Sequence, residues 1–539
     1  MRIGIAQVNS SVGDIENNTV LITNTISRGR EQNLDLIIFP ELVLCGYPPD
    51  DLLYRPSLYD KIGRALNTII NASMGIQLLL GYPRNVNGKI YNSCVFIQNG
   101  NLITHYDKIL LPNYGVFDEK RYFTEGSTPC LIDLNGIRTA LTICEDLWSD
   151  LPIQMAANAG AKLIISINSS PFHINKPAER IGALKARFHE SNLPIIYVNS
   201  VGGQDELVFD GASMVMDNMG EIIFRAPNFE EGLYVFETHS ENSGSLSFKV
   251  PPNLPINDIE EQTIYQALVL AVRDYVRKNR FNGVIIGLSG GIDSALVACI
   301  AVDALGKENV NVLLMPSRHT SEMSNADALL LAKNLGISTN TISIEGPYKA
   351  FIDELAPVFR ELPVDTTEEN IQARCRGVLL MAVSNKMHKL VLTTGNKSEM
   401  SVGYATLYGD MAGGFSPLKD VSKLQVYRLC KWKNTISNVI PVRIIERPPS
   451  AELRPDQKDS DSLPPYEILD PILELYIEQD QNPGQIINAG YNRDDVLRVI
   501  KLVNQNEYKR RQSAPGVKIS RKAFGRERRY PITSGYREE

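Results

Sequence analysis

The 539-residue sequence lacks the patterns of common protein metal sites. Its seven cysteines include no CxxC pair, and its six histidines include no HExxH motif. These absences argue against a structural zinc site, and the odd, unpaired cysteine count favours reduced thiols. No apolar run approaches the roughly 20 residues of a membrane span, and residues 2–6 alternate like a strand rather than forming a signal-peptide core. The sequence therefore predicts a cytoplasmic protein with no membrane partner.

The sequence also has no net positive charge, because it contains 55 Lys and Arg residues and 62 Asp and Glu residues. A net charge of −7 does not favour nucleic acid as a partner. Residues 518–529 are an exception, with six cations against Glu527 alone. Such a run is either a solvated tail or a basic surface, and here it favours a phosphate-rich ligand or a subunit contact over nucleic acid.

The length favours two domains and allows three. We place a first domain at 1–242, a linker rich in Ser, Asn and Pro at 243–257, and a second domain at 258–539. The first domain combines helix-like stretches with short apolar runs, which predicts an α/β fold with a many-stranded sheet. The helix-like stretches are 17–33 and 177–191, and the runs are 2–8, 36–39, 76–82, 93–98, 139–144, 163–167 and 195–198.

The second domain alternates strands and helices, which predicts a doubly wound parallel sheet. The charged, proline-rich segment 446–467 is interpreted as a loop. The expected strands are 283–288, 310–315, 339–344 and 389–394, and the expected helices are 258–280, 293–305 and 321–335.

Three reactive side chains of the first domain lie just beyond apolar runs. They are Glu41 in LIIFPEL, Lys108 in HYDKILLP and Cys144 in ALTICEDLW. Loops after strand ends are where α/β folds assemble sites from distant sequence. A thiolate, a carboxylate and an ammonium can serve as nucleophile, base and charge stabiliser in attack on an amide or nitrile carbon. The alternative for Cys144 is a small buried hydrophobic residue at a strand end.

Taken in this order, the segments FPEL, DK-x-x-LP and CED resemble the nitrilase (carbon–nitrogen hydrolase) superfamily across residues 1–240. The resemblance implies a four-layer αββα sandwich and an amidase that forms a thioester. By position, Glu41 would be the general base, Lys108 the third triad member and Cys144 the nucleophile. Glu119, in FDEKRYF, matches the auxiliary glutamate that orients the lysine.

Within the glutamine-using branch of that superfamily, the resemblance implies that Tyr114, Ser170 and Lys176, beside Glu119, hold glutamine. Ser170 is equally interpreted as a turn serine before a proline, and Lys176 as a solvated lysine. Two other classes of glutamine hydrolase do not fit. One needs cysteine directly after the initiator methionine, where Arg2 stands, and the other needs a G-x-C-x-G elbow in place of TICED.

The second domain carries a glycine-rich loop, GLSGGIDS, without the lysine of a Walker loop. Its glycines and the hydroxyls of Ser289 and Ser294 can donate to an anion at a helix N-terminus. Asp293 would repel polyphosphate unless a divalent cation lay between them, so the loop predicts magnesium held jointly with ATP. The alternative is that Asp293 only caps the helix. The predicted ATP contacts of the loop are Gly287, Leu288, Ser289, Gly290, Gly291, Ile292, Asp293 and Ser294.

The SGGxDS pattern resembles the loop of the N-type ATP pyrophosphatases, which have an adenine nucleotide alpha hydrolase-like fold. Residues 393–423 further resemble the NAD synthetase signature. The resemblance implies that Thr394 contacts ATP and that Glu399 joins Asp293 at magnesium. The predicted deamido-NAD contacts are Asn370, Glu399 and Lys509, with Asp410 and Lys423 as further candidates. For Asn370 and Lys509, a residue near a helix start and a solvated lysine are the competing interpretations.

Together, the two domains resemble the glutamine-dependent NAD synthetase family. That resemblance implies the substrates L-glutamine, ATP and deamido-NAD, Mg²⁺ with ATP, no prosthetic group, and a homo-oligomer. Two alternatives remain open. The chain could adenylate another carboxylate, or it could be an amidase with an ATP-sensing module.

Overall fold

The computed structural model describes residues 1–240, 246–252, 259–455, 457, 459–461, 463–536 and 538. The chain divides into two compact units, Met1–Asp258 and Ile259–Glu539. Much of the expected linker 243–257 lies outside the described residues. Its residues 246–249 form a strand instead, because Leu246 is buried against the first unit's core and the segment pairs antiparallel with the preceding strand.

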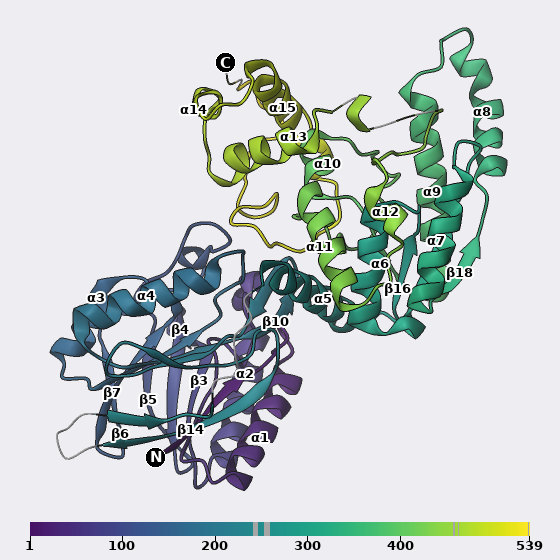
Figure 1. Cartoon of the computed structure of the whole chain (residues 1–539). Coiled ribbons are helices and arrows are strands. Elements are labelled where there is room, and N and C mark those ends of the chain that lie inside the picture. Colours follow the sequence, from purple (N-terminus) through teal and green to yellow (C-terminus); the bar gives the residue numbers. More distant parts are fainter. Residues whose placement is uncertain are drawn as a thin grey trace. The chain divides into compact units, whose positions relative to one another are not determined.

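The first unit contains two mixed sheets (Figure 1). One sheet has the order β15-β14-β1-β2-β3-β4-β5 and the other β13-β12-β9-β8-β7-β6. The strands of the first sheet are β1 (Arg2–Gln7), β2 (Leu36–Ile38), β3 (Gln77–Val86), β4 (Lys89–Gln98), β5 (Asn101–Asp107), β14 (Gly232–Ser240) and β15 (Leu246–Lys249). Those of the second are β6 (Cys130–Leu134), β7 (Ile137–Ile143), β8 (Leu163–Asn168), β9 (Ile195–Asn199), β12 (Met214–Met216) and β13 (Ile222–Arg225), and a separate hairpin joins β10 (Val201–Gln204) to β11 (Leu207–Asp210).

Helices cover the outer faces of these sheets, giving the expected four layers (Figure 1). Helices α1 (Ile15–Glu31) and α2 (Pro56–Ala72) pack on the first sheet, and α3 (Asp150–Asn158) and α4 (Lys176–Ser191) pack on the second. A third core of alternate strand residues, such as Ile38, Leu141 and Ile165, fills the space between the sheets. This burial on both faces explains why the strands read as continuous apolar runs.

The second unit is built on a parallel sheet of order β18-β17-β16-β19. Its strands are β16 (Val284–Gly287), β17 (Val310–Leu314), β18 (Ser338–Thr341) and β19 (Leu390–Leu392). This confirms the expected parallel α/β fold. Strand β18 ends at Thr341, three residues before the end of the expected strand 339–344. It is a fully exposed edge strand, and Ile344 already caps the next helix.

Helices surround this sheet and extend beyond it (Figure 1). They are α5 (Glu260–Lys278), α6 (Ile292–Leu305), α7 (Glu322–Leu335), α8 (Glu345–Phe359), α9 (Thr366–Met387), α10 (Lys397–Val402), α11 (Lys423–Ile436), α12 (Val442–Glu446), α13 (Tyr466–Leu473), α14 (Pro483–Asn488), α15 (Arg493–Gln505) and α16 (Glu507–Arg510). Between α12 and α13 the described residues contain only a short 3₁₀ turn, Asp459–Asp461.

Two cations of the basic run 518–529 are internal to the second unit. Lys518 is buried and lies 3.4 Å from Glu527, and Arg528 is buried and donates to Glu507 at 2.9 Å. These two residues therefore stabilise the C-terminal segment rather than extending into solvent. A phosphate-binding or subunit role for the rest of the run stays a prediction.

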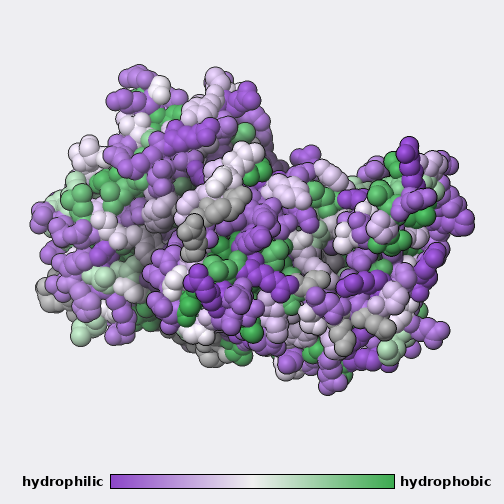
Figure 2. Space-filling model, turned by 90° about the horizontal axis from the view of Figure 1, so that it is seen from above, coloured by the Kyte–Doolittle hydropathy of each residue, from purple (hydrophilic) through white to green (hydrophobic). Residues whose placement is uncertain are grey.

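Among the described residues, no helix is long and apolar enough to cross a membrane. Figure 2 shows mostly hydrophilic residues on the visible face, with apolar residues in separate patches.

Candidate functional sites

The first unit brings Glu41 and Lys108 into direct contact. Glu41 follows β2 and Lys108 follows β5, so both lie just beyond strand ends. The Lys108 Nζ atom lies 2.8 Å from Glu41 Oε1 and 2.9 Å from Glu119 Oε1. All three side chains are buried. Glu119 thus holds the ammonium from a second side, as the auxiliary role assigned to it would require.

Cys144 follows β7 and is almost completely buried. Its φ of +44° lies in the left-handed region, which is rare for a residue other than glycine and is a form of strain often found at functional sites. Burial raises the pKa of its thiol well above the usual value, the charge of Glu41 adds to this effect, and Lys108 opposes it. The resting thiol is therefore protonated, so a base must take its proton during attack.

Lys108 keeps its charge despite complete burial. Burial alone would lower its pKa, but the carboxylates of Glu119 and Glu41 outweigh that effect and raise the pKa well above its ordinary value. Burial raises the pKa of Glu119 itself, although Lys108 counteracts part of the shift. The site therefore holds one fixed cation between two carboxyl groups, and that cation can stabilise a developing oxyanion.

Two residues that the sequence did not single out fix Glu41. The Asn92 side-chain amide donates to Glu41 Oε1 at 2.7 Å, and the Ser169 backbone N–H donates to Glu41 Oε2 at 2.8 Å. Lys108 also donates its backbone N–H to the Asn92 carbonyl at 2.9 Å. In the sequence, Asn92 is visible only as a polar residue directly before the apolar run 93–98, and Ser169 only as a second serine beside Ser170.

Two of the predicted glutamine contacts lie around the segment that follows Cys144. The Tyr114 hydroxyl, on a side chain that is 58% exposed, donates to Glu145 at 2.9 Å. The Lys176 Nζ atom lies 3.9 Å from the centroid of the Trp148 ring and 3.4 Å from Glu179. These two side chains therefore flank residues 145–148, directly after Cys144.

Ser170 has a different environment from the other predicted glutamine contacts. It is buried, its hydroxyl accepts from Arg180 Nε at 3.2 Å, and its backbone N–H donates to Asn199. Arg180 is in turn paired with buried Asp210 at 2.7 Å. The structure thus gives the Ser170 hydroxyl a role inside the protein, and its contact with glutamine stays a prediction.

In the second unit the loop 287–294 joins β16 to the start of α6. Gly290 has a φ of +80°, and a Cβ atom there would lie 2.3 Å from the Ser324 carbonyl oxygen. Only glycine fits this position without a shift of the backbone. The Ser289 hydroxyl accepts from the Gly291 N–H at 3.2 Å and lies 3.1 Å from the Ser294 hydroxyl. The loop is thereby held with its hydroxyls and amides gathered at the helix N-terminus.

Asp293 and Glu399 share one lysine. The Lys423 Nζ atom lies 2.5 Å from Asp293 Oδ2 and 3.1 Å from Glu399 Oε1. The Asn396 side-chain amide donates to Asp293 Oδ1 at 2.9 Å. Burial alone would lower the pKa of Lys423, but the two carboxylates raise it, so the lysine is charged. Burial raises the pKa of Glu399, and Lys423 opposes the shift.

A cavity of about 290 Å³ lies over this loop. Its walls include every residue of 287–294 together with the predicted contacts Thr394, Glu399, Asp410 and Lys423. Arg376 of α9 also lines the cavity and donates to the Met315 carbonyl at 3.1 Å. The sequence did not single out Arg376, although a cation is a natural wall residue for a nucleotide cavity.

Asn370 and Lys509 contact the segment 403–406. Asn370 Oδ1 accepts from the Thr406 hydroxyl at 2.8 Å, and the Lys509 ammonium donates to the carbonyls of Gly403 and Ala405 at 2.9 and 3.0 Å. The Thr406 N–H donates to Asp410 at 2.6 Å. These two predicted dinucleotide contacts, Asn370 and Lys509, therefore meet at one loop, and neither lines the cavity over 287–294.

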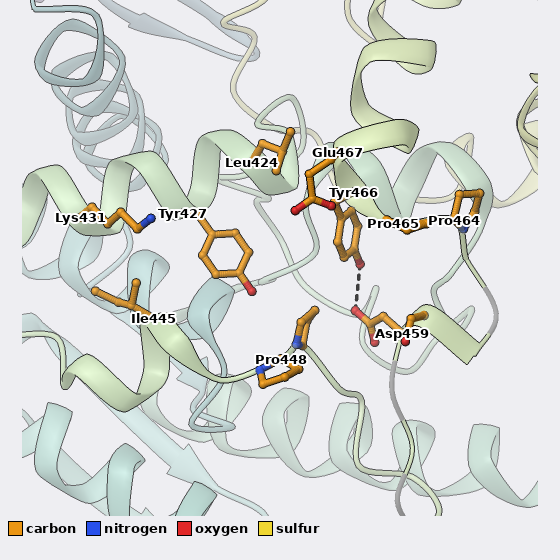
Figure 3. Close-up of a pocket in the computed structure, with 12 residues that line it drawn as sticks. Leu424, Tyr427, Lys431, Ile445, Pro448, Asp459, Pro464, Pro465, Tyr466 and Glu467 are labelled. Carbon is orange, nitrogen blue, oxygen red and sulfur yellow. Dashed lines mark hydrogen bonds between the residues drawn. The ribbon is translucent and has the colours of Figure 1, made fainter. Parts of the chain in front are cut away.

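A second cavity of about 450 Å³ adjoins the first (Figure 3). The two cavities share Tyr427, Pro448, Pro449 and Asp459. Figure 3 shows the Tyr466 hydroxyl directed at Asp459, to which it donates at 2.8 Å. The described residues of the expected loop 446–467 therefore supply most of the lining of the second cavity and a smaller part of the wall of the first.

Comparison with known proteins agrees with this two-part organisation. The carbon–nitrogen hydrolase family model matches residues 2–246, and the NAD synthase family model matches residues 264–513. A glutamine-dependent NAD(+) synthetase from Acinetobacter baylyi is 46% identical over 100% of this chain and 99% of its own length. One from Thermotoga maritima is 43% identical over 100% of this chain and 99% of its own.

A solved structure adds the same result in three dimensions. The glutamine-dependent NAD+ synthetase from Acinetobacter baumannii, in complex with adenosine diphosphate, has a TM-score of 0.80 and 43% identity, covering 100% of this chain and 99% of that one. The two family models and the named relatives define an ATP-dependent ligase in which a carbon–nitrogen hydrolase unit accompanies an NAD synthase unit. The chain belongs to the glutamine-dependent NAD(+) synthetase family.

Proposed function

We propose that the chain makes NAD from deamido-NAD, with ATP as activator and L-glutamine as nitrogen donor. The sum is glutamine, deamido-NAD, ATP and water giving glutamate, NAD, AMP and diphosphate. The observation that carries this proposal is the presence of two separate sites, the buried Cys144 site and the cavity over 287–294, in a chain whose full-length relatives are named for this activity.

In the first site, the Cys144 sulfur attacks the side-chain amide carbon of glutamine while Glu41 takes the thiol proton. Lys108, held by Glu41 and Glu119, stabilises the oxyanion of the tetrahedral intermediate. Glu41 returns this proton to the nitrogen as collapse breaks the carbon–nitrogen bond, and the nitrogen leaves as ammonia. Water activated by Glu41 then hydrolyses the thioester and releases glutamate. Tyr114 and Lys176, which contact Glu145 and Trp148, would bind the amino-acid end of glutamine.

In the second site, a carboxylate oxygen of deamido-NAD attacks the α-phosphorus of ATP, and diphosphate leaves. Ammonia then attacks the carbonyl carbon of the acyl adenylate, and AMP leaves as the amide forms. The loop amides and the hydroxyls of Ser289 and Ser294 would hold the departing diphosphate. Thr394, on the cavity wall, would contact ATP, and Glu399, Asn370 and Lys509 would bind deamido-NAD.

Mg²⁺ is a further part of this proposal. Asp293 and Glu399 supply carboxylate oxygens, the donors that Mg²⁺ prefers, and they lie close enough together to share the Lys423 ammonium. Within the described residues, no group of three or more His, Cys, Asp and Glu side chains could hold a metal ion alone. Phosphate oxygens would complete the site. Bound there, Mg²⁺ would neutralise charge on the phosphates and favour the departure of diphosphate.

Ammonia links the two reactions, and in water at neutral pH it is mostly protonated and not nucleophilic. We infer that it passes to the second site without equilibrating with solvent. We also expect a homo-oligomer, as the family resemblance implies, and a cytoplasmic location; both stay predictions.

Incubation of the protein with glutamine, ATP, Mg²⁺ and deamido-NAD tests the proposal. We expect NAD, AMP, diphosphate and glutamate to form in equal amounts, as measured by chromatography. Replacing deamido-NAD with other carboxylic acids tests the alternative acceptor. Glutamate release with no AMP under any acceptor would contradict the ligase and support an amidase with an ATP-sensing unit.

A further inference from the structure

Asp146 is a buried carboxylate that the proposed chemistry does not use. It is completely buried, and its two oxygens accept four hydrogen bonds. Oδ1 accepts from the backbone N–H groups of Ile109 at 3.2 Å and Leu110 at 2.9 Å. Oδ2 accepts from the Tyr106 hydroxyl at 2.7 Å and from the Ile143 N–H at 3.0 Å. Such complete satisfaction of a buried carboxylate fixes every group that takes part.

The four donors belong to the two segments that carry the predicted lysine and nucleophile. Tyr106, Ile109 and Leu110 flank Lys108, and Ile143 directly precedes Cys144. One side chain therefore ties the backbone after β5 to the end of β7. We propose that Asp146 is a positioning residue that sets the distance between the Lys108 ammonium and the Cys144 sulfur. This inference rests on the proposed amidase reaction.

That distance matters because the thiolate must form in a buried site. The interaction of two charges depends directly on their separation, and it is strongest where water is excluded. Cys144 also holds a left-handed backbone conformation, which persists only if its surroundings enforce it. The bond from the Ile143 N–H to Asp146 is one such restraint, on the residue directly before Cys144. A displacement of about 1 Å at a reacting centre costs on the order of 10²-fold in rate.

The variant Asp146→Asn tests the proposal in the full-length protein. Asparagine keeps the size of the side chain and one acceptor oxygen, but its NH₂ group must face two of the four donors. We expect the kcat of glutaminase to fall about 10- to 100-fold, with KM for glutamine changed less than about threefold. Ammonia-dependent NAD synthesis should be unchanged, which reports that the second unit is intact.

A second measurement separates positioning from a purely structural role. The readout is the rate of Cys144 alkylation by iodoacetamide as a function of pH, after subtraction of the rate measured with Cys144→Ala. In Asp146→Asn this rate should begin to increase at a higher pH than in the wild type, because Lys108 stabilises the thiolate less. Tyr106→Phe removes one donor only and should shift both readouts in the same direction by a smaller amount. Asp217→Asn is the matched control, because Asp217 accepts from the N–H groups of Met219 and Glu221 in a distant turn.

The possible outcomes are distinct. Wild-type kcat and an unchanged alkylation profile in Asp146→Asn would overturn the proposal. So would equal losses in Asp146→Asn and Asp217→Asn. If Asp146→Asn does not fold, an unchanged alkylation profile in Tyr106→Phe would have the same consequence. A wild-type protein that releases no glutamate from glutamine would instead overturn the proposed amidase function, on which this inference rests.

Discussion

Both units place one lysine between two carboxylates, yet the two arrangements differ in burial. Lys108 lies between Glu41 and Glu119, whose side chains are 0% and 5% exposed. Lys423 lies between Asp293 and Glu399, whose side chains are 16% and 18% exposed and face a cavity. The carboxylates of the first cluster are closed from solvent, whereas those of the second have surface left for another ligand.

This difference matches the chemistry proposed for each site. An amidase needs a cation that stays in place as charge moves between sulfur and oxygen, and burial between two carboxylates fixes it. A site that accepts a metal with its nucleotide must instead be able to exchange partners. If Mg²⁺ binds at the second site as proposed, it must share Asp293 and Glu399 with Lys423. We therefore expect the two clusters to respond differently when their lysines are replaced.

The largest expected effect separates the two sites completely. Cys144→Ala should reduce glutamine-dependent NAD synthesis by about 10⁴-fold or more, because the nucleophile is lost. Synthesis from ammonium chloride should remain within about twofold of the wild type, because the second site is untouched. NAD formation with each nitrogen source measures this. Loss of both activities would contradict the assignment of two separate sites.

Asp293→Ala should have the complementary effect, with loss of the second site's reaction and not of the first's. We expect synthesis to fall on the order of 10³-fold with either nitrogen source, because a proposed ligand of the metal is removed. Glutamate release should persist. Exchange of labelled diphosphate into ATP in the presence of deamido-NAD measures the adenylation step directly. Normal exchange in this variant would show that Asp293 only caps α6.

Replacing each lysine by methionine sharpens the comparison. Without Lys423, the carboxylates of Asp293 and Glu399 would be unbalanced and open to a divalent cation. We expect Lys423→Met to bind Mn²⁺ about tenfold more tightly than the wild type in the absence of nucleotide, a change of about 1.4 kcal/mol. Lys108→Met should show no such gain, since Glu41 and Glu119 are closed from solvent.

An electron paramagnetic resonance titration of free Mn²⁺ gives these affinities. The double variant Lys423→Met, Glu399→Gln is the control and should return the affinity to the wild-type level. Equal Mn²⁺ binding by Lys423→Met and the wild type would remove the support for metal binding between these carboxylates.

In both units, the sequence predicted some features of the fold and of the candidate sites and missed others. Apolar runs predicted most of the strands, because buried parallel strands carry few polar residues. Glu41, Lys108 and Cys144 stood out because they lie just beyond such runs, and Asp293 because it lies in a glycine-rich loop that lacks the Walker lysine. The strand Leu246–Lys249 was missed, because its four residues lie next to a Ser- and Asn-rich stretch and gain their stability from pairing with β14.

Supporting residues were much harder to predict. Asn92 and Ser169 donate to Glu41 from 51 and 128 positions away, and Asp146 accepts from Leu110, 36 positions away, so no local pattern marks these contacts. Asp146 stood within the CED motif, but its partners across the fold could not be read from the motif. Lys423 was a further candidate in the sequence, and only the three-dimensional structure shows that it bridges Asp293 and Glu399.

The smallest expected effect concerns buried carboxylates that tie loops together in both units. Asp146 joins the segments of Lys108 and Cys144. Asp470 accepts from the Ser398 hydroxyl at 2.5 Å and from the Leu424 N–H at 2.9 Å, and thereby joins the segments that carry Glu399 and Lys423. Burial raises the pKa of Asp146 to about 6, although the Tyr106 hydroxyl opposes the shift, and burial also raises the pKa of Asp470.

A raised pKa means that the folded protein binds this proton more tightly than the unfolded chain does. The resulting stabilisation is complete below the unfolded pKa, 3.8 for an aspartate, and is lost as pH rises through about 6. Asp146→Asn removes the titration together with some hydrogen bonds. The variant should be less stable than the wild type at pH 4, and the deficit should narrow toward pH 6.5, by at most about 1.4 kcal/mol per pH unit.

Thermal unfolding of both proteins at pH 4 and pH 6.5 measures this difference, with Asp217→Asn as the control for a carboxylate in a partly exposed turn. Asp470→Asn should show the same sign in the second unit. A deficit that widens with pH would mean that the four donors around Asp146 stabilise its ionised form more than burial disfavours it. Asp146 would then hold the segments of Lys108 and Cys144 together most strongly at neutral pH, where the thiolate of Cys144 must form.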